Sequence, residues 1–382
     1  MKKIKRIAIV IPKYGLIGGA EFYAAQLAER IAEDPFYDIH VFANRWSGNS
    51  NRITFHKVPI ITFPKYLTTI SFAYFAQKKI SKMNFDLIHA HDRIFNADIF
   101  TMHGIPHRLW VKDIRKKKHL SLFDRATAWV EKRLVTIGGC KTFLAVSELT
   151  KQKFLKEYSL PDPERIRVLH PGVELERFIR PDRKECRDRI RERFGFSADD
   201  IVILFASMNF DIRGLDHLIR GLAMVKSRNP AAKIKLLVVG KGKPEPYARI
   251  AGSLGIGADV VFAGIFQKTE MAEVLFAADI FSILSLFDTF SITVLEAMAA
   301  SLPVIISGNM GIKDLIQQCT NGMVVHDISD PDQVSEKIEL LLDASIRERM
   351  GAKAFETARL QDWSFVAQKI DQIYKSILGE QK

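Results

Sequence analysis

Residues 5–34, KRIAIVIPKYGLIGGAEFYAAQLAERIAED, set the pattern that decides the fold. The apolar run KRIAIVIP is typical of a short strand that is buried on both faces of a sheet. YGLIGGA then supplies a glycine-bearing loop, and EFYAAQLAERIAED has the apolar spacing of an amphipathic helix. A strand, loop and helix in this order form the repeating unit of parallel sheets that carry helices on both faces.

The same alternation runs through the chain twice, which predicts an α/β protein with two doubly wound parallel sheets. In the first series, strands are expected at residues 38–43, 85–91, 98–104 and 142–147, and helices at 70–83 and 121–135. In the second series, strands are expected at residues 201–207, 234–240, 259–264, 280–285, 303–307 and 322–326.

The chain of 382 residues is longer than one hydrophobic core usually supports. We expect a first domain at 1–179, a second at 180–360, and a terminal amphipathic helix at 361–382. The charged, proline-containing stretch 165–195 is interpreted as the connection plus an Arg-rich, solvated helix. Ligands of open parallel sheets bind outside the carboxyl ends of the strands, so two facing sheets would form a cleft between them.

Basic residues are concentrated in the first half of the chain. The first 180 residues hold 31 Lys and Arg against 17 Asp and Glu, a net charge of +14, whereas the remainder has −2. This asymmetry indicates a phosphorylated substrate, an anionic lipid surface or nucleic acid as the partner. The alternative is that the positive charge only keeps the protein soluble. No recognisable nucleic-acid-binding module is present, so we expect no nucleic-acid partner.

The cysteines favour a cytosolic location. Cys140, Cys186 and Cys319 lie far apart, as expected for reduced thiols. The start MKKIKR with IAIVI lacks the cleavage site of a signal peptide, and its apolar run ends at Pro12. No stretch approaches the roughly 20 apolar residues of a membrane-spanning helix, so any membrane contact is expected to be peripheral.

Two carboxylates stand out in residues 285–307, SLFDTFSITVLEAMAASLPVIIS. Asp288 and Glu296 are separated by seven residues, and a helix is expected to begin near Ile292. Asp288 would then lie on the preceding loop and Glu296 within the helix. A loop carboxylate can bind sugar hydroxyls, and one on the helix can bind a ribose diol. The alternative is that neither carboxylate binds a ligand, and that the pair is only an acidic N-cap region and a glutamate on the protein surface.

The start of the same helix is a candidate phosphate site. The N-terminus of a helix offers unpaired backbone N–H groups and the positive end of its dipole. The amides around Phe290, Ser291 and Ile292 are therefore expected to hold a diphosphate.

The D-x7-E pattern followed by AMAASLPV resembles the retaining glycosyltransferases of group 1, of the family 4 type. Members usually show E-x7-E with a central glycine, followed by A-x-G-x-P-V; this chain has Asp288, Ser291 and Ser301 at the differing positions. The resemblance implies the GT-B fold, with two facing Rossmann-like domains and a C-terminal helix that crosses back to the first. It also implies a catalytic, sugar-contacting role for Asp288 and a ribose-binding role for Glu296.

Further segments resemble the family in the expected order. Residues 145–178 are similar to its strand-to-linker region, and residues 205–223 to the loop after the first strand of the second domain. The family places a basic residue beside a glycine there, so the resemblance implies that Arg213 neutralises the donor diphosphate. Asn209 in this loop and Gly240 at the end of the next strand complete the expected donor-binding set.

Candidates in the first domain also come from the resemblance. Gly18 and Gly19 permit a close approach of the backbone to a ligand, although paired glycines more often mark a turn. In the family this loop borders the donor phosphates and the acceptor, which makes Glu21 an acceptor-side candidate. His103, at the end of an expected strand, corresponds to a histidine near the reacting sugar and is a catalytic candidate.

Residues 107–119, HRLWVKDIRKKKH, form a basic run next to the aromatic residues Trp110, Phe123 and Trp129. Such a segment can attract anionic headgroups or a phosphorylated acceptor, and it is similar to transferases of lipopolysaccharide core assembly. His107 and Arg108 are accordingly acceptor-side candidates. A solvated basic loop remains the alternative, and the histidine pair offers too few ligands for zinc.

The resemblance implies a retaining transfer of a hexose-type sugar from a nucleotide-sugar, with UDP-sugar favoured over GDP-sugar. The acceptor would be an anionic or membrane-associated glycan or lipid in lipopolysaccharide or cell-surface polysaccharide synthesis, at the inner face of the cell membrane. No metal is expected, because a D-x-D pair is absent and backbone amides and arginine supply positive charge. A nicotinamide dehydrogenase is disfavoured because G-x-G-x-x-G is missing. A sugar-nucleotide epimerase or a non-catalytic binding protein on the same fold remains the alternative.

Overall fold

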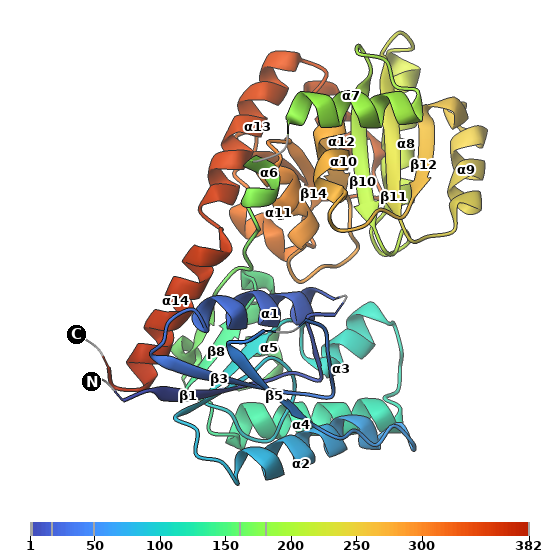
Figure 1. The fold of residues 1–382 in the computed structure, drawn as a ribbon. Helices are drawn as coiled ribbons and strands as arrows, with labels where there is room; N and C mark the ends of the chain where they lie inside the picture. The colour runs from blue at the N-terminus through green and yellow to red at the C-terminus, as the bar shows by residue number, and fades with distance from the viewer. Residues whose placement is uncertain (1–2, 17, 49, 160–161, 180–181, 381–382) are drawn as a thin grey trace. The chain divides into compact units, whose positions relative to one another are not determined.

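The computed structural model describes residues 3–16, 18–48, 50–159, 162–179 and 182–380. The chain forms two compact units, one of Met1–Gly172 with Trp363–Lys382 and the other of Val173–Asp362. The chain thus leaves the first unit at Gly172, seven residues before the position expected from the sequence; residue 180 itself lies outside the described residues. Figure 1 draws the helices and strands of both units.

Within the described residues, the first unit contains a seven-stranded sheet in which neighbouring strands run parallel. Its order is β5 (Ile53–Lys57), β3 (Tyr37–Ala43), β1 (Lys5–Val10), β6 (Leu87–Ala90), β7 (Ile99–Met102), β8 (Thr142–Ala145) and β9 (Ile166–Val168). The strands expected from apolar runs are present. The edge strands β5 and β9 were not expected, and β9 corrects part of the stretch interpreted as a connection. Both are short and only partly buried, so they lack the apolar run of a central strand.

Helices cover both faces of this sheet (Figure 1). Alternate residues of β1 point to opposite sides: Ile7 and Ile9 join one core, and Ala8 and Val10 the other. The first core is closed by α1 (Gly19–Ile31) and α14 (Trp363–Ile377), and the second by α2 (Leu67–Ile80) and α4 (Leu122–Ile137).

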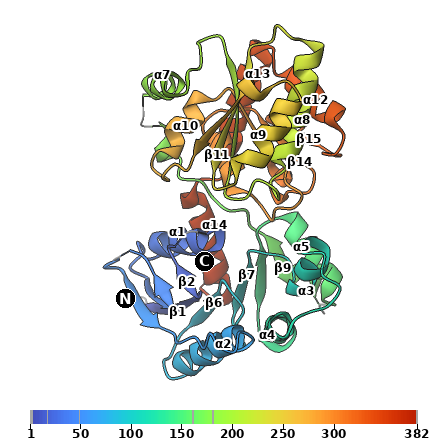
Figure 2. The same ribbon diagram turned by 90° about the vertical axis from the view of Figure 1, so that its right-hand side faces the viewer.

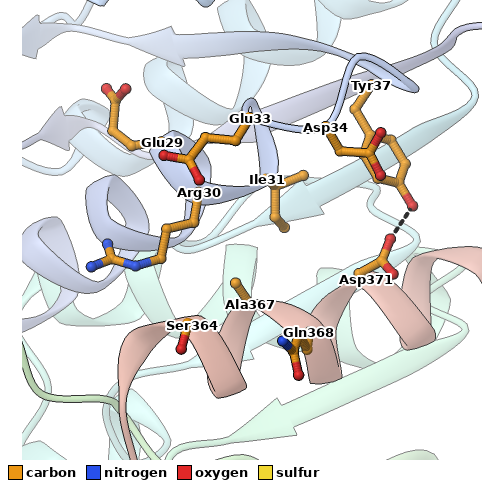
Figure 3. Close-up of a pocket in the computed structure, with 10 residues that line it drawn as sticks. All are labelled: Glu29, Arg30, Ile31, Glu33, Asp34, Tyr37, Ser364, Ala367, Gln368 and Asp371. Atoms are coloured by element: carbon orange, nitrogen blue, oxygen red, sulfur yellow. Dashed lines mark hydrogen bonds between the residues drawn. The ribbon is translucent and has the colours of Figure 1, made fainter.

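The C-terminal helix α14 belongs to this first unit. Trp363 is fully buried, Tyr374 shares a hydrogen bond of 2.7 Å with Nδ1 of His89, and the Tyr37 hydroxyl donates to Asp371 at 2.7 Å. Figure 3 shows the last contact in a pocket of about 480 Å³ between α1 and α14, where acidic, other polar and apolar side chains form the lining. Because Tyr37 begins β3, this pocket lies at the amino ends of the strands, opposite to where ligands of such sheets bind.

The described residues of the second unit contain a six-stranded sheet whose neighbouring strands also run parallel. Its order is β12 (Val260–Gly264), β11 (Ile234–Gly240), β10 (Ile201–Ser207), β13 (Ile280–Ile283), β14 (Val304–Ser307) and β15 (Gly322–Val325). Helices lie on both sides of this sheet (Figure 2). They are α6 (Glu176–Ile179), α7 (Arg183–Phe194), α8 (Leu215–Arg228), α9 (Pro244–Ser253), α10 (Met271–Ala277), α11 (Ile292–Ala299), α12 (Pro331–Leu340) and α13 (Ala344–Arg359).

The Arg-rich helix α7 is not the solvated helix that the sequence indicates. Arg191 is only 4% exposed, and its guanidinium pairs with Asp279 at 2.6 Å. Arg187 pairs with the same carboxylate at 2.7 Å, and Arg191 also donates to the Ala277 carbonyl at the end of α10. The two arginines therefore satisfy backbone and carboxylate oxygens at a helix C-terminus, where positive charge is favoured.

Two serines adopt a backbone conformation that favours glycine. Ser291 has φ 84° and Ser301 has φ 59°, and these are positions where the family more commonly has glycine. A β-carbon in this region is strained by roughly 1–2 kcal/mol, which the greater flexibility of glycine in the unfolded chain partly offsets.

Replacing Ser301 by glycine is expected to raise the free energy of unfolding by about 0.5–1 kcal/mol, measured by urea denaturation. The substitution also removes the bond from Arg183 to the Ser301 hydroxyl, 3.3 Å long. Ser301→Ala is the matched control, because it removes the same hydroxyl but keeps the strained β-carbon. A Ser301→Gly protein no more stable than Ser301→Ala would contradict the explanation from backbone strain.

Candidate functional site

The strand order of the second unit creates a switch point beside β10. The chain proceeds outward from β10 through β11 to β12 and then returns to β13 on the other side of β10. The loops that follow β10 and β13 therefore open a crevice at the carboxyl ends of these strands, the usual ligand site of such sheets. Backbone bonds hold the two loops together, from Leu284 to the Arg213 carbonyl (3.2 Å) and from Leu286 to the Ile212 carbonyl (2.8 Å).

Arg213 and Asp288 meet at this switch point. The Arg213 guanidinium forms an ion pair with Asp288 through Nη1, and the same nitrogen donates to Ser285 Oγ at 3.2 Å. Within the described part of the chain both contacts use Nη1, which leaves Nε and Nη2 to receive an anion. Both charged side chains are partly buried. The guanidinium of Arg213 and the carboxylate of Asp288 thus lie next to each other at the carboxyl ends of β10 and β13.

The helix α11 begins at Ile292, as the sequence indicates, and its N-terminus lies next to Asp288 in the chain. Ser291 is the N-cap residue, and its side chain makes no capping hydrogen bond, so the first-turn amides are not satisfied by that hydroxyl. The Phe290 amide donates to Asp288 Oδ1 at 3.3 Å, and the Phe290 ring is buried. Phe290 therefore shapes the loop, and the amides available to an anion belong to the residues that follow it.

Two further candidates lie near the carboxyl ends of β10 and β11. The Asn209 side chain is exposed, and its Oδ1 accepts a bond of 3.0 Å from the Ile212 amide, which shapes the turn before Arg213. Gly240 ends β11 in register with Ser207. Its φ is 127°, and a β-carbon there would collide with the Ser207 carbonyl. Gly240 is thus required for two adjacent strand ends to approach each other beside the crevice.

Glu296 lies farther along α11 and is held by a residue that the sequence did not single out. Its side chain is 15% exposed, and its Oε1 accepts from Nη1 of Arg177 at 2.8 Å. Burial raises the pKa of Glu296, while Arg177 acts in the opposite direction. The two residues are 119 positions apart, so no local spacing could have indicated the pair.

In the first unit, His103 follows β7 and contacts a second histidine. Nδ1 of His91 lies 3.0 Å from Nε2 of His103, the two rings are stacked, and the edge of Tyr23 meets His103 at 4.9 Å between centroids. Burial lowers the pKa of His103 to about 3, so the ring is neutral at neutral pH. His91 directly follows β6 beside β1, so both histidines lie at the carboxyl ends of the strands. His91 lies in a segment that the sequence predicts as a strand, but it was not singled out.

Three buried polar atoms of this cluster have no hydrogen-bond partner among the described residues: the Tyr23 hydroxyl, Nε2 of His91 and Nε1 of Trp363. Buried polar groups are nearly always bonded to protein, water or ligand. The cluster is therefore suited to hold ordered water or polar groups of a ligand.

The glycine loop of the first unit carries a carboxylate. Gly18 is the N-cap of α1 with φ 155°, and a β-carbon there would collide with the Glu21 side chain. A β-carbon at Gly19 would meet open space. Glu21 therefore lies over the start of α1, where negative charge is favoured, and a phosphate at these amides would lie close to it.

Two buried carboxylates of α4, those of Asp124 and Glu131, hold the basic segment 107–119 in place through hydrogen bonds. Asp124 accepts from Nε2 of His107 at 2.9 Å and from Arg115 at 3.1 Å, and Glu131 accepts from the His107 amide at 2.9 Å. Burial alone would raise the pKa of Asp124, but hydrogen bonds from Ser121 and His107 lower it to about 2. His107 thus anchors the segment, a role the sequence did not indicate.

The anchored segment encloses a basic pocket of about 530 Å³. Arg108 is exposed at its edge and lies 3.9 Å from Glu157. The pocket is lined by Arg108, Val111, Lys112, Lys116, Lys117, Lys118, His119 and Leu120. Close to this segment, Leu122 and Trp129 on α4 are exposed by 67% and 49%.

In the described ranges of the chain, no group of three or more His, Cys, Asp or Glu side chains is arranged to hold a metal ion. None of the helices in these ranges combines the length and apolarity needed to cross a lipid bilayer.

Each half of the chain matches a known protein family. Residues 187–357 match the model of the glycosyl transferases group 1, and residues 17–177 match that of Glycosyltransferase Family 4. A D-inositol 3-phosphate glycosyltransferase of Stackebrandtia nassauensis is 26% identical over 93% of this chain and 86% of its own length. An uncharacterized glycosyltransferase of Methanocaldococcus jannaschii is 25% identical over 97% and 98%.

Solved structures share the fold. WaaG, a glycosyltransferase involved in lipopolysaccharide biosynthesis, superposes with a TM-score of 0.79 at 21% identity, over 96% of this chain and 99% of WaaG. HepE of Anabaena, solved in complex with UDP and glucose, gives a TM-score of 0.71 at 17% identity, over 97% and 99%. The fold is therefore that of GT-B proteins, with two parallel-sheet α/β domains. From its two family matches, the chain belongs to the group 1 glycosyltransferases of the family 4 type and is a transferase enzyme.

Proposed function

We propose that this glycosyltransferase moves a hexose-type sugar, with retention at the anomeric carbon, from a UDP-sugar to an anionic glycan or glycolipid. The observation that carries the donor half of this proposal is the switch point of the second unit. There Arg213, Asp288 and the N-terminus of α11 are brought to the carboxyl ends of β10 and β13. HepE, which shares the fold, was solved with UDP and glucose, and this supports a UDP-sugar donor.

Each group at the switch point matches one part of such a donor. The free nitrogens of Arg213 and the first-turn amides of α11 bind the diphosphate, which disperses the charge that develops on the leaving group. Glu296 accepts the ribose hydroxyls, and Asp288 contacts the hydroxyls of the sugar. Because arginine and amides supply the positive charge, the proposed reaction needs no metal ion.

The proposed reaction is a direct exchange at the anomeric carbon. The acceptor oxygen forms a bond to this carbon on the face from which the diphosphate departs. The bond to the phosphate oxygen breaks, and the acceptor proton passes to a phosphate oxygen of the leaving UDP. The ring of His103, the catalytic candidate of the first unit, is neutral at neutral pH because burial lowers its pKa to about 3. A covalent sugar adduct on Asp288 would overturn this scheme.

The basic pocket of the first unit supports an anionic acceptor. Four lysines, one arginine and one histidine line a concave surface that two buried carboxylates hold in shape. The similar D-inositol 3-phosphate transferase is named for a phosphorylated compound, and WaaG for lipopolysaccharide biosynthesis. We therefore place the acceptor among phosphorylated cell-surface glycans or their lipid-linked forms. The exposed Trp129 and Leu122 would add peripheral contact with the inner face of the cell membrane.

A thermal-shift panel tests the donor assignment. UDP-, GDP- and ADP-glucose are each added to the purified chain, first with a chelator and then with a divalent metal. A rise in Tm with UDP-glucose in the chelator supports the proposal. A rise only with metal overturns the metal-free site, and no rise with any nucleotide overturns the donor assignment. Transfer to an added acceptor, without epimerised free donor, separates the proposed reaction from an epimerase.

Replacing Lys116, Lys117 and Lys118 together by glutamine is expected to weaken binding to phosphatidylglycerol vesicles about a hundredfold at low salt. Each basic residue near an anionic surface contributes about 1 kcal/mol, and salt screens the effect. Co-sedimentation measures the binding, with phosphatidylcholine vesicles as the lipid control. The matched control replaces the exposed lysines 78, 79 and 82 of the same unit. Equal losses in both triple variants would show that net charge, not the pocket, attracts the surface.

A further inference from the structure

The contact between Arg177 and Glu296 belongs to a chain of charged groups in the second unit. Nη1 of Arg177 lies 2.8 Å from Glu296 Oε1 and 3.7 Å from Glu174, and Nη2 donates to the Lys268 carbonyl. The Lys268 ammonium in turn pairs with Glu174 at 2.8 Å. The side chains of Arg177 and Glu296 are 19% and 15% exposed. Glu174 and Arg177 come from one segment, Lys268 comes from a second, and Glu296 comes from α11, so the ion pairs and hydrogen bonds join three segments of the unit.

We propose that Arg177 is a positioning residue, which keeps the Glu296 carboxylate ionised and oriented so that it can receive the two hydroxyls of the donor ribose. The inference rests on the proposed function, because it deepens the role given there to Glu296. It adds a residue that lies outside the D-x7-E segment and far from it in sequence.

The need for such a residue follows from the burial of Glu296. Loss of hydration disfavours the charged form and raises the pKa of this carboxyl group; Arg177 and Lys268 lower it, and Glu174 raises it. A ribose diol offers two donors, which suit an ionised carboxylate with two accepting oxygens. A protonated carboxyl group has one oxygen that must donate instead. Without Arg177, the buried group would hold its proton at higher pH and accept the diol poorly.

The geometry also fixes orientation. Nη1 of Arg177 is directed to Oε1, and among the described residues no other side chain forms a hydrogen bond or ion pair with this carboxylate, so Oε2 remains for a ligand. The Lys268 carbonyl holds the other end of the guanidinium. Nη1 and Nη2 of Arg177 are thus both directed at protein oxygens, which favours an indirect role over direct contact with the nucleotide. An ion pair at an exposed surface would have little effect on the charge state or orientation of its carboxylate. This pair is mostly buried, so removal of Arg177 would leave a buried carboxylate without its partner.

The test compares Arg177→Gln, Arg177→Lys and the wild-type chain by isothermal titration with UDP at pH about 6 and about 9. We expect Arg177→Gln to bind UDP about tenfold or more weakly than wild type at the lower pH. Most of that affinity returns at the higher pH, where the carboxyl group ionises. Arg177→Lys keeps the charge and is expected to follow wild type. Arg359→Gln, an exposed arginine of α13, is the matched control and is expected to change neither value.

The outcomes separate this inference from the function on which it rests. Unchanged UDP affinity of Arg177→Gln, or an equal loss at both pH values, overturns the positioning role. Circular dichroism and Tm show whether the variant is folded, and a variant that fails to fold is replaced by Arg177→Lys, for which a pH-independent loss is the overturning result. Failure of the wild-type chain to bind UDP, or no effect of Glu296→Ala, overturns the ribose assignment itself.

Discussion

Replacing Glu296 by alanine is expected to weaken UDP binding about a hundredfold or more. Hydrogen bonds to a charged group contribute about 1.5–3 kcal/mol each, and a ribose diol can form two with this carboxylate. The low exposure of the side chain, 15%, strengthens these bonds because little water competes for the oxygens. Isothermal titration of the wild-type and variant chains with UDP measures the loss.

A second ligand makes this prediction specific to the ribose. The same titrations are repeated with UDP that lacks the 2′ and 3′ hydroxyls. If Glu296 binds the diol, the dideoxy nucleotide should bind wild type and Glu296→Ala with nearly equal affinity, because the interaction is already absent. Glu296→Gln, which keeps the shape beside Arg177, controls for the loss of the buried ion pair. If Glu296→Ala loses the same affinity for both nucleotides, Glu296 supports the structure of the unit and does not bind the ribose.

Replacing Arg213 by methionine is expected to reduce kcat about a hundredfold to a thousandfold. The reaction places negative charge on the leaving diphosphate, and removing one donor aimed at developing charge usually has an effect of this size. Arg213→Lys is expected to retain part of the activity, because it keeps the charge but not the two-pronged geometry. Initial rates with UDP-glucose and a phosphorylated acceptor measure both values.

The same experiment needs a control for Asp288, the ion-pair partner of Arg213. Asp288 would lose its counter-ion in Arg213→Met, so the double variant with Asp288→Asn shows how much of the effect comes from the carboxylate left without its ion-pair partner. Arg220→Met, on the exposed side of α8, is the matched control for loss of one positive charge. A raised KM with an unchanged kcat would mean that Arg213 binds the donor without stabilising the departing charge.

Local patterns in the sequence predict the architecture because parallel strands buried on both faces need continuous apolar runs. KRIAIVIP and IVILFAS are such runs, and they form the central strands β1 and β10. The start of α11 at Ile292 was also predictable from the segment around it. Edge strands β5 and β9 escaped prediction because they are short, only partly buried, and lack a continuous apolar run.

The sequence by itself thus determined the α/β alternation, the seven-residue spacing of Asp288 and Glu296, and the basic segment 107–119. Only the tertiary structure decided which charges meet. Arg213 reaches Asp288 across 75 residues, and Arg177 reaches Glu296 across 119. It also buried Arg191 of a helix whose composition indicates a solvated surface. The physical reason is that helical and strand periodicity depend on neighbouring residues, whereas ion pairs depend on where the crossovers return each strand to the sheet.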